Sequence, residues 1–434
     1  MALKHVYFAG RDQVRFSWAR HRFAFIPSGV PDDFDFARLE HMVVLKLDGK
    51  LGDTQAMTHF YANVQRHCPN LHLSVVCPDN LVPVYRDVLH FDTVLPSSRK
   101  PKAAEIKSIC ARLTSSAPPV DLVVSTEGCY RPRDFIFNYE LKPRFVAGCD
   151  ARLQGKEINL FLFDPDSDRR HITQCFCDFM ARGHLAYEPV SYVPLYTPEI
   201  LGAVQTSLGL APNARMEQDA DADAEAAAPL LQKQQPRSAP LIVGINPCGA
   251  PQARRFSVPM VVSLIVAVQR YWLEHHLQAQ HQLKILLMCP DSLRDFQQAV
   301  QQQLQGVIAT AAAGTEAGTG DDAAGMTGLR LEGVEPPELM FLPSSCSVEE
   351  YAAHIACLAA LVTVDTAAVH LACASHIPQL CFYLGDANSF EDKRWAPVGA
   401  RAQVVRPQTE RLDQMEQKTF VAMSMQFLQQ VLPQ

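Results

Sequence analysis

The chain has 434 residues, of which 48% are hydrophobic and 20% charged, and its formal net charge is −7. This length exceeds one ordinary hydrophobic core and predicts two domains, while the mildly acidic balance argues against a nucleic-acid partner. No apolar run reaches the roughly 18 residues of a membrane-spanning helix, and the N-terminus lacks the apolar stretch of a signal peptide. We therefore expect a cytoplasmic protein, and peripheral contact with the inner face of the inner membrane stays open.

The thirteen cysteines are spread along the chain, and most of them lie in apolar runs. Such surroundings are typical of buried thiols in a reducing compartment. Cys175 and Cys177 form a pair, but no second cysteine or histidine pair follows at the spacing of a zinc site. We expect no metal and no cofactor, with a metal at this pair as the weaker alternative.

Residues 1–41 are expected to be an N-terminal extension. They contain a possible strand, HVYFA, and an aromatic and arginine-rich stretch, RFSWARHRFAF. One interpretation of this stretch is a contact with a membrane surface or a partner. The favoured interpretation is a hairpin or extension that packs on the first domain.

Residues 42–211 are expected to form the first Rossmann-like domain, because β-rich runs alternate with helical patterns. Strands are predicted at MVVLKLD, LHLSVVCP, DTVLP and DLVVST, and further strands at FVAGC and INLFLF. Helical patterns cover residues 54–67 and 102–115, with a helical turn at 85–91. This alternation predicts a parallel sheet with helices on both faces.

Residues 212–240 interrupt the pattern and are expected to be a linker or disordered insertion, because they are rich in Ala, Asp, Gln and Pro. A second Rossmann-like domain is expected over residues 241–434. Its predicted strands are LIVGINP, KILLMCP, MFLP, ALVTVD and QLCFYLG, the last of which closes the set. Its predicted helices cover residues 258–276, 292–305, 348–358 and 366–375, and residues 309–328 are expected to be a flexible loop.

The first candidate site follows the strand MVVLKLD, where a loop delivers Gly52 and Asp53 to the start of a helix. Asp53 lies at or near the position of a helix cap, and spacing alone favours that capping role. The functional alternative is a carboxylate that accepts a proton from an attacking hydroxyl. Lys50 is a further candidate in the same loop.

The second candidate site follows the strand ALVTVD. Asp365 and Thr366 lie where a helix begins, and His370 follows about one turn later. Amides at a helix start suit a diphosphate, and Asp365 is suited to sugar hydroxyls. The alternative is a helix cap with a packed histidine, which is favoured when this segment is considered alone.

The third candidate site is the loop NPCGA, in which Gly249 permits close approach of the backbone to an anion. Arg254 and Arg255 follow shortly after, and either can neutralise a phosphate. Each of the three segments occurs where a strand leads into a helix, which is where ligands bind in Rossmann-like sheets.

Taken together, KLDGKLGDT, NPCGA with its following arginines, and VTVDTAAVHLACASHIPQLCFYLG…RWAPVG resemble glycosyltransferase family 9, the ADP-heptose:lipopolysaccharide heptosyltransferases. The resemblance covers roughly residues 42–405. It implies an α/β GT-B fold of two Rossmann-like domains that face a central cleft. It also implies metal-independent transfer with inversion, with the acceptor on the N-terminal domain and the nucleotide-sugar on the C-terminal domain.

The resemblance also assigns roles to residues. Asp53 matches the general base of the family's Gly-Asp motif, and Asp365 matches the acid that holds the donor sugar. Arg254 takes the place where the family usually has lysine near the donor phosphates, with Arg255 as its neighbour.

Thr366 lies in the phosphate-facing loop of the family, and His370 matches the histidine of that motif. The chain departs from the family at Ala367, where glycine is common; the added methyl narrows the approach of the backbone to the donor.

The function expected from these features is transfer of a sugar, heptose from ADP-heptose, to a hydroxyl of a lipopolysaccharide-core or other glycan or lipid-linked acceptor. Three alternatives stay open. They are a catalytically inactive nucleotide-sugar-binding or assembly protein of the same fold, a glycosyltransferase that acts on a protein, and another two-domain enzyme such as an epimerase.

Overall fold

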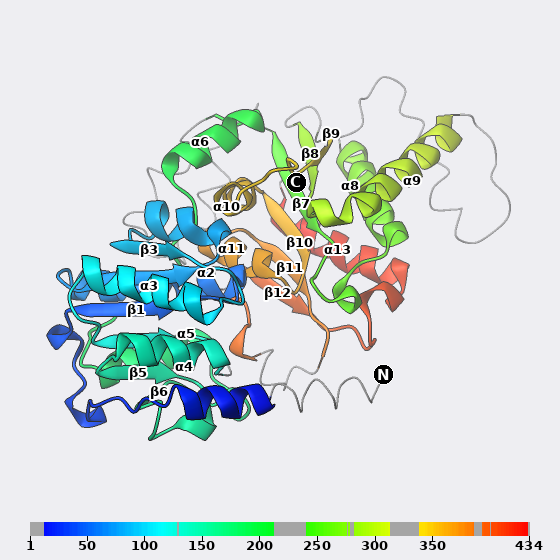
Figure 1. Cartoon of the computed structure of the whole chain (residues 1–434). Helices are drawn as coiled ribbons and strands as arrows, with labels where there is room; N and C mark the ends of the chain where they lie inside the picture. The colour runs from blue at the N-terminus through cyan, green and yellow to red at the C-terminus, as the bar shows by residue number, and fades with distance from the viewer. Residues whose placement is uncertain are drawn as a thin grey trace. The chain divides into compact units, whose positions relative to one another are not determined.

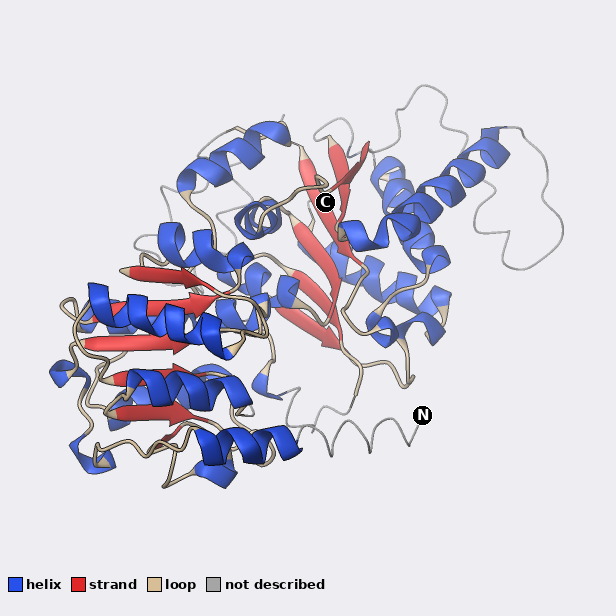
Figure 2. Ribbon diagram, viewed as in Figure 1, coloured by secondary structure: helices blue, strands red, loops and turns tan. Residues whose placement is uncertain are grey.

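The protein is described here from a computed structural model, which covers residues 13–127, 130–211, 240–275, 277, 282–312, 338–385, 393–399 and 401–432. These residues form two compact units. The first contains the described residues up to Leu195 together with residues 393–396, and the second contains the remainder. Each unit has one parallel sheet with helices against it (Figures 1 and 2), so the predicted α/β class is confirmed.

The first sheet has six parallel strands in the order β3-β2-β1-β4-β5-β6. Its central strands are mostly apolar and are buried along their whole length, as expected of a parallel sheet covered on both faces. The strands are β1 (His41–Leu45), β2 (His72–Cys77), β3 (Thr93–Pro96), β4 (Leu122–Ser125), β5 (Phe145–Gly148) and β6 (Leu160–Phe161).

Two pairs of helices contact each other in the first unit, α2 with α5 and α3 with α4. Between the α3–α4 pair and the sheet lies an apolar core that includes Val43, Ile109 and Phe137. The helices are α2 (Leu51–His67), α3 (Ala103–Ser116), α4 (Pro132–Leu141) and α5 (Ile172–Arg182). Short 3₁₀ turns occur at Pro31–Asp33, Phe36–Arg38, Asp79–Leu81 and Ala151–Leu153, and a π-helical turn at Val84–Val88.

Residues 13–22 form a helix that belongs to the first unit. Ala19 and Phe23 are buried in the core of this unit, and Phe16 contacts Phe135 edge to face. The expected packing on the first domain is therefore correct, whereas a hairpin is wrong for the described part of the stretch. The possible strand HVYFA lies outside the described residues.

The second sheet repeats the topology of the first. Its six parallel strands have the order β12-β11-β10-β7-β8-β9. If β7 is counted as the first strand of this unit and the sheet is read from β9, this is the same order as in the first sheet. The strands are β7 (Leu241–Asn246), β8 (Leu283–Leu287), β9 (Glu338–Phe341), β10 (Ala360–Val364), β11 (Gln379–Phe382) and β12 (Ala402–Val405).

The helices of the second unit also contact one another in groups. Helix α8 contacts α9 and α13, and α10 contacts α6 and α11. They are α6 (Pro198–Ser207), α8 (Val258–Glu274), α9 (Arg294–Ala312), α10 (Val348–Ala356), α11 (Ala367–Ala374) and α13 (Gln417–Val431). Short 3₁₀ turns occur at Gln252–Arg254, Asp291–Leu293 and Leu412–Gln414.

The boundary between the units differs from the predicted one. The predicted first domain extends to residue 211, but residues 198–207 form helix α6, which was not predicted, contacts α10 and lies in the second unit. Arg394 makes the opposite change: its Nη2 donates to the carbonyls of Pro165, at 2.8 Å, and Asp168, at 2.9 Å, in the first unit. Both departures arise because contacts distant in sequence decide which core a segment joins.

Three further differences concern single elements of the second unit. Helix α9 continues to Ala312, so residues 309–312 are helical where a loop was expected; the remainder of that predicted loop, and the predicted linker over 212–239, lie outside the described residues. The strand QLCFYLG does not close the sheet, because β12 pairs beyond it. The strand β12 was missed because its residues are only partly buried, as is usual at a sheet edge, and its apolar signal is weak.

In each sheet the strand order reverses beside the first strand of the unit, between β1 and β4 and between β7 and β10. Ligands of doubly wound sheets bind at such a switch point, outside the carboxyl ends of the strands. No described helix is long and apolar enough to cross a membrane.

Candidate functional site

In the first unit, Asp53 lies just beyond the carboxyl end of β1. The loop between β1 and α2 turns at Gly49, whose φ of 65° is favoured by glycine, and the Asp48 carboxylate accepts from the Lys50 amide at 3.3 Å. Lys50 is the N-cap residue of α2, so Asp53 is in the first helical turn and the predicted capping role is wrong. Gly52 is the second residue of this helix.

Three charged side chains surround the Asp53 carboxylate. The ammonium of Lys46, which is completely buried, lies 2.6 Å from Asp48 Oδ1 and 3.9 Å from Asp53 Oδ2. The more exposed Lys50 ammonium lies 3.7 Å from Asp53 Oδ2. A negative charge in the first turn of a helix is also favoured by the helix dipole.

Burial is the largest influence on the pKa of Asp53. It raises the pKa of this carboxyl above its ordinary value, aided by the charge of Asp48 and opposed by Lys46 and Lys50. Burial also acts to raise the pKa of Asp48, but the charge and hydrogen bond of Lys46, together with the amide and charge of Lys50, outweigh it, so the net shift of the Asp48 pKa is downward. Of the two neighbouring carboxylates, Asp53 is therefore the one suited to accept a proton.

A cluster of arginines at the same edge of the first sheet was not recognised from the sequence. Arg131 and Arg133, which follow β4, both pair with Glu127. Arg133 also donates to the carbonyl of Arg99, at 2.6 Å, and the guanidinium of Arg99 lies against Gly49 in the β1–α2 loop. The cluster joins loops far apart in sequence, which is why spacing did not reveal it.

In the second unit, an asparagine at the end of β7 connects the two sides of the switch point. The Asn246 amide donates to Thr363 Oγ1 at 2.9 Å and to Thr366 Oγ1 at 2.8 Å. Thr366 also caps α11, because its hydroxyl accepts from the Ala368 amide at 3.3 Å. The capping interpretation of Thr366 is correct, and Ala367 is the first residue of the helix that it caps.

Asp365 and Arg254 form an ion pair across the same switch point. Arg254 Nη1 lies 2.5 Å from Asp365 Oδ2, and both side chains are partly exposed to solvent. The two residues follow different strands, β7 and β10, which are neighbours in the sheet. The pair combines a cation for phosphate with a carboxylate for hydroxyl groups at one edge.

Arg255 has a different environment from Arg254. Its Nε donates to the Gly249 carbonyl at 3.3 Å, and its backbone pairs with Cys248. A Cβ on Gly249 would lie 2.7 Å from Arg254 Cβ, so a larger residue here would displace the chain that carries Arg254. The structure thus directs Arg254 to Asp365 and Arg255 to its own loop.

His370 lies in α11, where it is buried with 5% of its surface exposed. The interpretation as a packed histidine therefore describes its exposure correctly. It lies in the same helix that Thr366 caps.

The cysteines form no metal cluster in the part of the chain that the structure describes, where no group of three potential ligands was found. Cys175 and Cys177 are buried in α5, and Cys177 Sγ lies 3.6 Å from His59 Nε2. The described cysteines are all free thiols. Among the described residues, the Cys175–Cys177 pair therefore has too few potential ligands around it to form a metal site.

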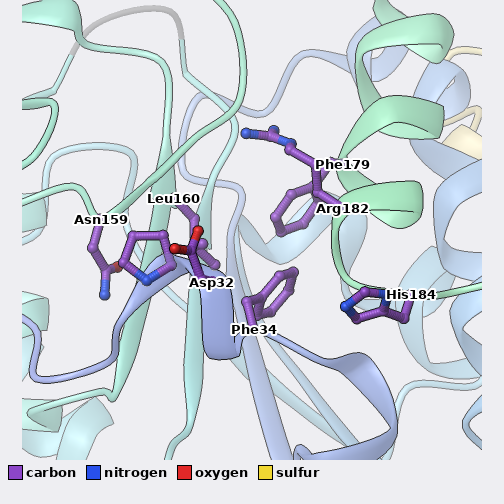
Figure 3. A pocket seen from close by; sticks show the side chains of 8 residues that line it. Asp32, Phe34, Asn159, Leu160, Phe179, Arg182 and His184 are labelled. Carbon is purple, nitrogen blue, oxygen red and sulfur yellow. The ribbon is translucent and has the colours of Figure 1, made fainter.

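A pocket of about 330 Å³ lies elsewhere in the first unit (Figure 3). Its buried lining includes Phe34 and Phe179, whose rings stack 5.3 Å apart, and Asp32, Arg182 and His184 stand around them. The pocket is next to the first residue of β6 and the last residue of α5. Both residues lie at the edge of the parallel sheet where its strands begin. The pocket is thus at the edge opposite Asp53 and is separate from the candidate site.

The fold is shared with known glycosyltransferases. A family 9 glycosyltransferase of Veillonella parvula superimposes with a TM-score of 0.63 at 12% identity, over 92% of this chain and 99% of that one. The E. coli ADP-heptose lipopolysaccharide heptosyltransferase II gives 0.57 at 12%, over 90% and 99%. E. coli heptosyltransferase WaaC with ADP-2-deoxy-2-fluoro heptose gives 0.55 at 14%, over 90% and 99%.

No protein-family model and no curated protein matches the sequence. At the identities above, the structural similarity establishes the fold, and it agrees with the two-domain architecture that the sequence resemblance implied.

Proposed function

We propose that the protein is an inverting, metal-independent glycosyltransferase that moves a sugar from a nucleotide-sugar to a hydroxyl group. The observation that carries the proposal is the pair of sites at matching switch points: a half-buried carboxylate with a raised pKa, Asp53, in one unit, and the Arg254–Asp365 pair in the other. A base and a donor site are the two parts that such a transfer requires.

The donor is proposed to bind to the second unit. Arg254 would pair with the diphosphate, the opening amides of α11 near Thr366 and Ala367 would approach it, and Asp365 would hold sugar hydroxyls. His370 would donate to a phosphate or sugar oxygen. ADP-heptose is favoured as the donor by the structural similarity to a heptosyltransferase with an ADP-sugar analogue.

The acceptor is proposed to bind to the first unit. Asp53 would take the proton of the acceptor hydroxyl as its oxygen attacks the anomeric carbon from the face opposite the diphosphate. The bond from that carbon to the diphosphate oxygen breaks, and the sugar configuration inverts. Arg254 offsets the charge that grows on the leaving diphosphate, which is the interaction that strengthens in the transition state.

The acceptor class is proposed to be a glycan of the lipopolysaccharide core or another surface glycan. Exposed arginines at this edge, Arg99 and Arg131, favour an acceptor with phosphate or carboxylate groups.

The direct test combines binding and turnover. We expect calorimetry to detect ADP-heptose binding, and mass spectrometry to detect one added heptose on a lipopolysaccharide-core acceptor. Donor binding without transfer to any acceptor in a panel of glycans, lipid-linked glycans and proteins would favour the inactive binding protein. Transfer to a protein alone would show that the acceptor is a protein and not a glycan. Absence of donor binding would contradict the proposal.

We also propose that the protein works in the cytoplasm with a peripheral contact to the membrane. The helix over residues 13–22 exposes Val14 and Trp18, with 69% and 61% of their surfaces accessible. Residues 13–31 contain three arginines and no acidic residue, although the whole chain is acidic. An exposed tryptophan with arginines is typical of a helix at an anionic lipid surface.

We expect the protein to float with phosphatidylglycerol-containing vesicles and not with pure phosphatidylcholine vesicles. The Arg15→Gln/Trp18→Ala variant should lose at least about fivefold in affinity, because one arginine near an anionic surface contributes about 1 kcal/mol. Met423→Ala, which removes an exposed apolar side chain of α13, serves as the control and should bind like the wild type. Equal flotation of all three proteins would contradict the contact.

A further inference from the structure

Lys46 is a buried cation that the reaction outlined above does not use. It follows β1 directly, and its amide donates to the Val76 carbonyl of β2 at 2.9 Å, so its backbone is held within the sheet. Its side chain is 1% exposed. A buried ammonium is costly in free energy unless carboxylates pair with it. Lys46 therefore requires carboxylate partners close to its ammonium.

Two carboxylates share this ammonium unequally. Asp48 Oδ1 lies 2.6 Å from Lys46 Nζ in a direct hydrogen bond, whereas Asp53 Oδ2 lies at 3.9 Å, beyond hydrogen-bond length. Asp48 is itself fixed, because the same Oδ1 accepts the Lys50 amide. Lys46 therefore attracts Asp53 without engaging it fully.

We propose that Lys46 and Asp48 act as a positioning pair for Asp53, in which Lys46 orients the Asp53 carboxylate at the edge of the sheet and Asp48 limits how strongly Lys46 engages it. This inference rests on the proposed role of Asp53 as the base. A carboxylate that paired fully with a buried lysine would be a weak base, and in a half-buried carboxyl without any cation nothing would oppose the rise in pKa that burial causes. The shared cation keeps Asp53 between these two conditions.

Four charged groups lie near Asp53 or against its loop. Lys46 comes from the end of β1, and Asp48 and Lys50 come from the loop before α2. Arg99, which follows β3, lies against Gly49 of the same loop. Only Lys46 among these cations is buried, so only its charge is poorly screened by water.

The positioning role predicts opposite shifts from two single substitutions. Lys46→Met removes the cation and should move the titration of Asp53, and the acid limb of kcat/KM, upward by roughly one pH unit or more. Asp48→Asn makes Asp53 the remaining carboxylate beside Lys46. It should move the titration of Asp53 and the acid limb of kcat/KM downward. A purely structural role for Lys46 would lower the melting temperature of its variant but move neither titration.

The titration is measured by NMR on protein labelled with ¹³C at the aspartate carboxyl carbons, with the Asp53 signal assigned by its loss in Asp53→Asn. Lys284→Met is the matched control, since Lys284 is also largely buried and pairs with Glu338 in the second unit. It should leave the Asp53 signal unchanged.

Circular dichroism establishes which variants fold. If Lys46→Met does not, Asp48→Asn still tests the inference through its downward shift, with Lys46→Gln as the milder removal of charge. Shifts in the same direction, or no shift in a folded Asp48→Asn protein, would overturn the positioning role. Full transfer activity in Asp53→Asn would instead refute Asp53 as the base while leaving the titration result intact, so the two failures are distinguishable.

Discussion

Replacing Asp53 by asparagine should lower kcat for sugar transfer by roughly 10²- to 10⁴-fold, the usual contribution of a general base. Asparagine has nearly the same shape but cannot accept the proton of the acceptor hydroxyl. Donor affinity should change little, because the proposed donor residues lie in the other unit. Single-turnover transfer and calorimetry with ADP-heptose measure the two effects separately.

The same substitution should preserve or increase stability at neutral pH. Because the folded-state pKa of Asp53 is raised, the folded protein holds this proton more tightly than the unfolded chain does. The free energy of unfolding therefore falls as the pH rises from the ordinary aspartate pKa through the raised one, and asparagine does not suffer that loss. The melting temperatures of the two proteins should converge at acid pH, and a strongly destabilised variant at neutral pH would contradict the raised pKa.

Replacing Arg254 by methionine should weaken ADP binding by roughly 10- to 100-fold, since a hydrogen bond between charged groups contributes about 1.5–3 kcal/mol. The loss has two parts. The diphosphate loses a cation, and Asp365 then faces it without the arginine that now lies 2.5 Å away. Isothermal titration with ADP measures the change without any acceptor.

Two variants separate these parts. Arg255→Met is the matched control, because Arg255 donates to its own loop, and it should weaken ADP binding far less. Asp365→Asn releases Arg254 and should keep or improve ADP binding, yet it should reduce sugar transfer because the carboxylate that holds the sugar is gone. Equal losses in Arg254→Met and Arg255→Met would contradict the assignment of Arg254 to the diphosphate.

The predicted elements were most accurate where the signal was local. The runs that became β1, β7 and β10 are continuous apolar segments of β-favouring residues, each followed by a polar or glycine-containing loop. Such a run is buried whichever strands flank it, so its identity does not depend on the rest of the fold.

Elements whose own residues carry a weaker signal are identified only by their contacts with other elements. The edge strand β12 and helix α13 were not predicted, although α13 packs on α8 through residues such as Phe427. Helix α6 was not predicted either, and its residues were included in the first domain because their sequence contains nothing that distinguishes one core from the other.

The sequence by itself determined the two βα series, the α/β class and the segments from which a site is built, since apolar periodicity and loop chemistry are encoded within a few residues. Only the tertiary structure decided the partners within those segments. It directs Arg254 rather than Arg255 to Asp365, and it gives Lys46 two carboxylates to share. Strand order and side-chain burial set these distances, and both result from contacts between residues far apart in the chain.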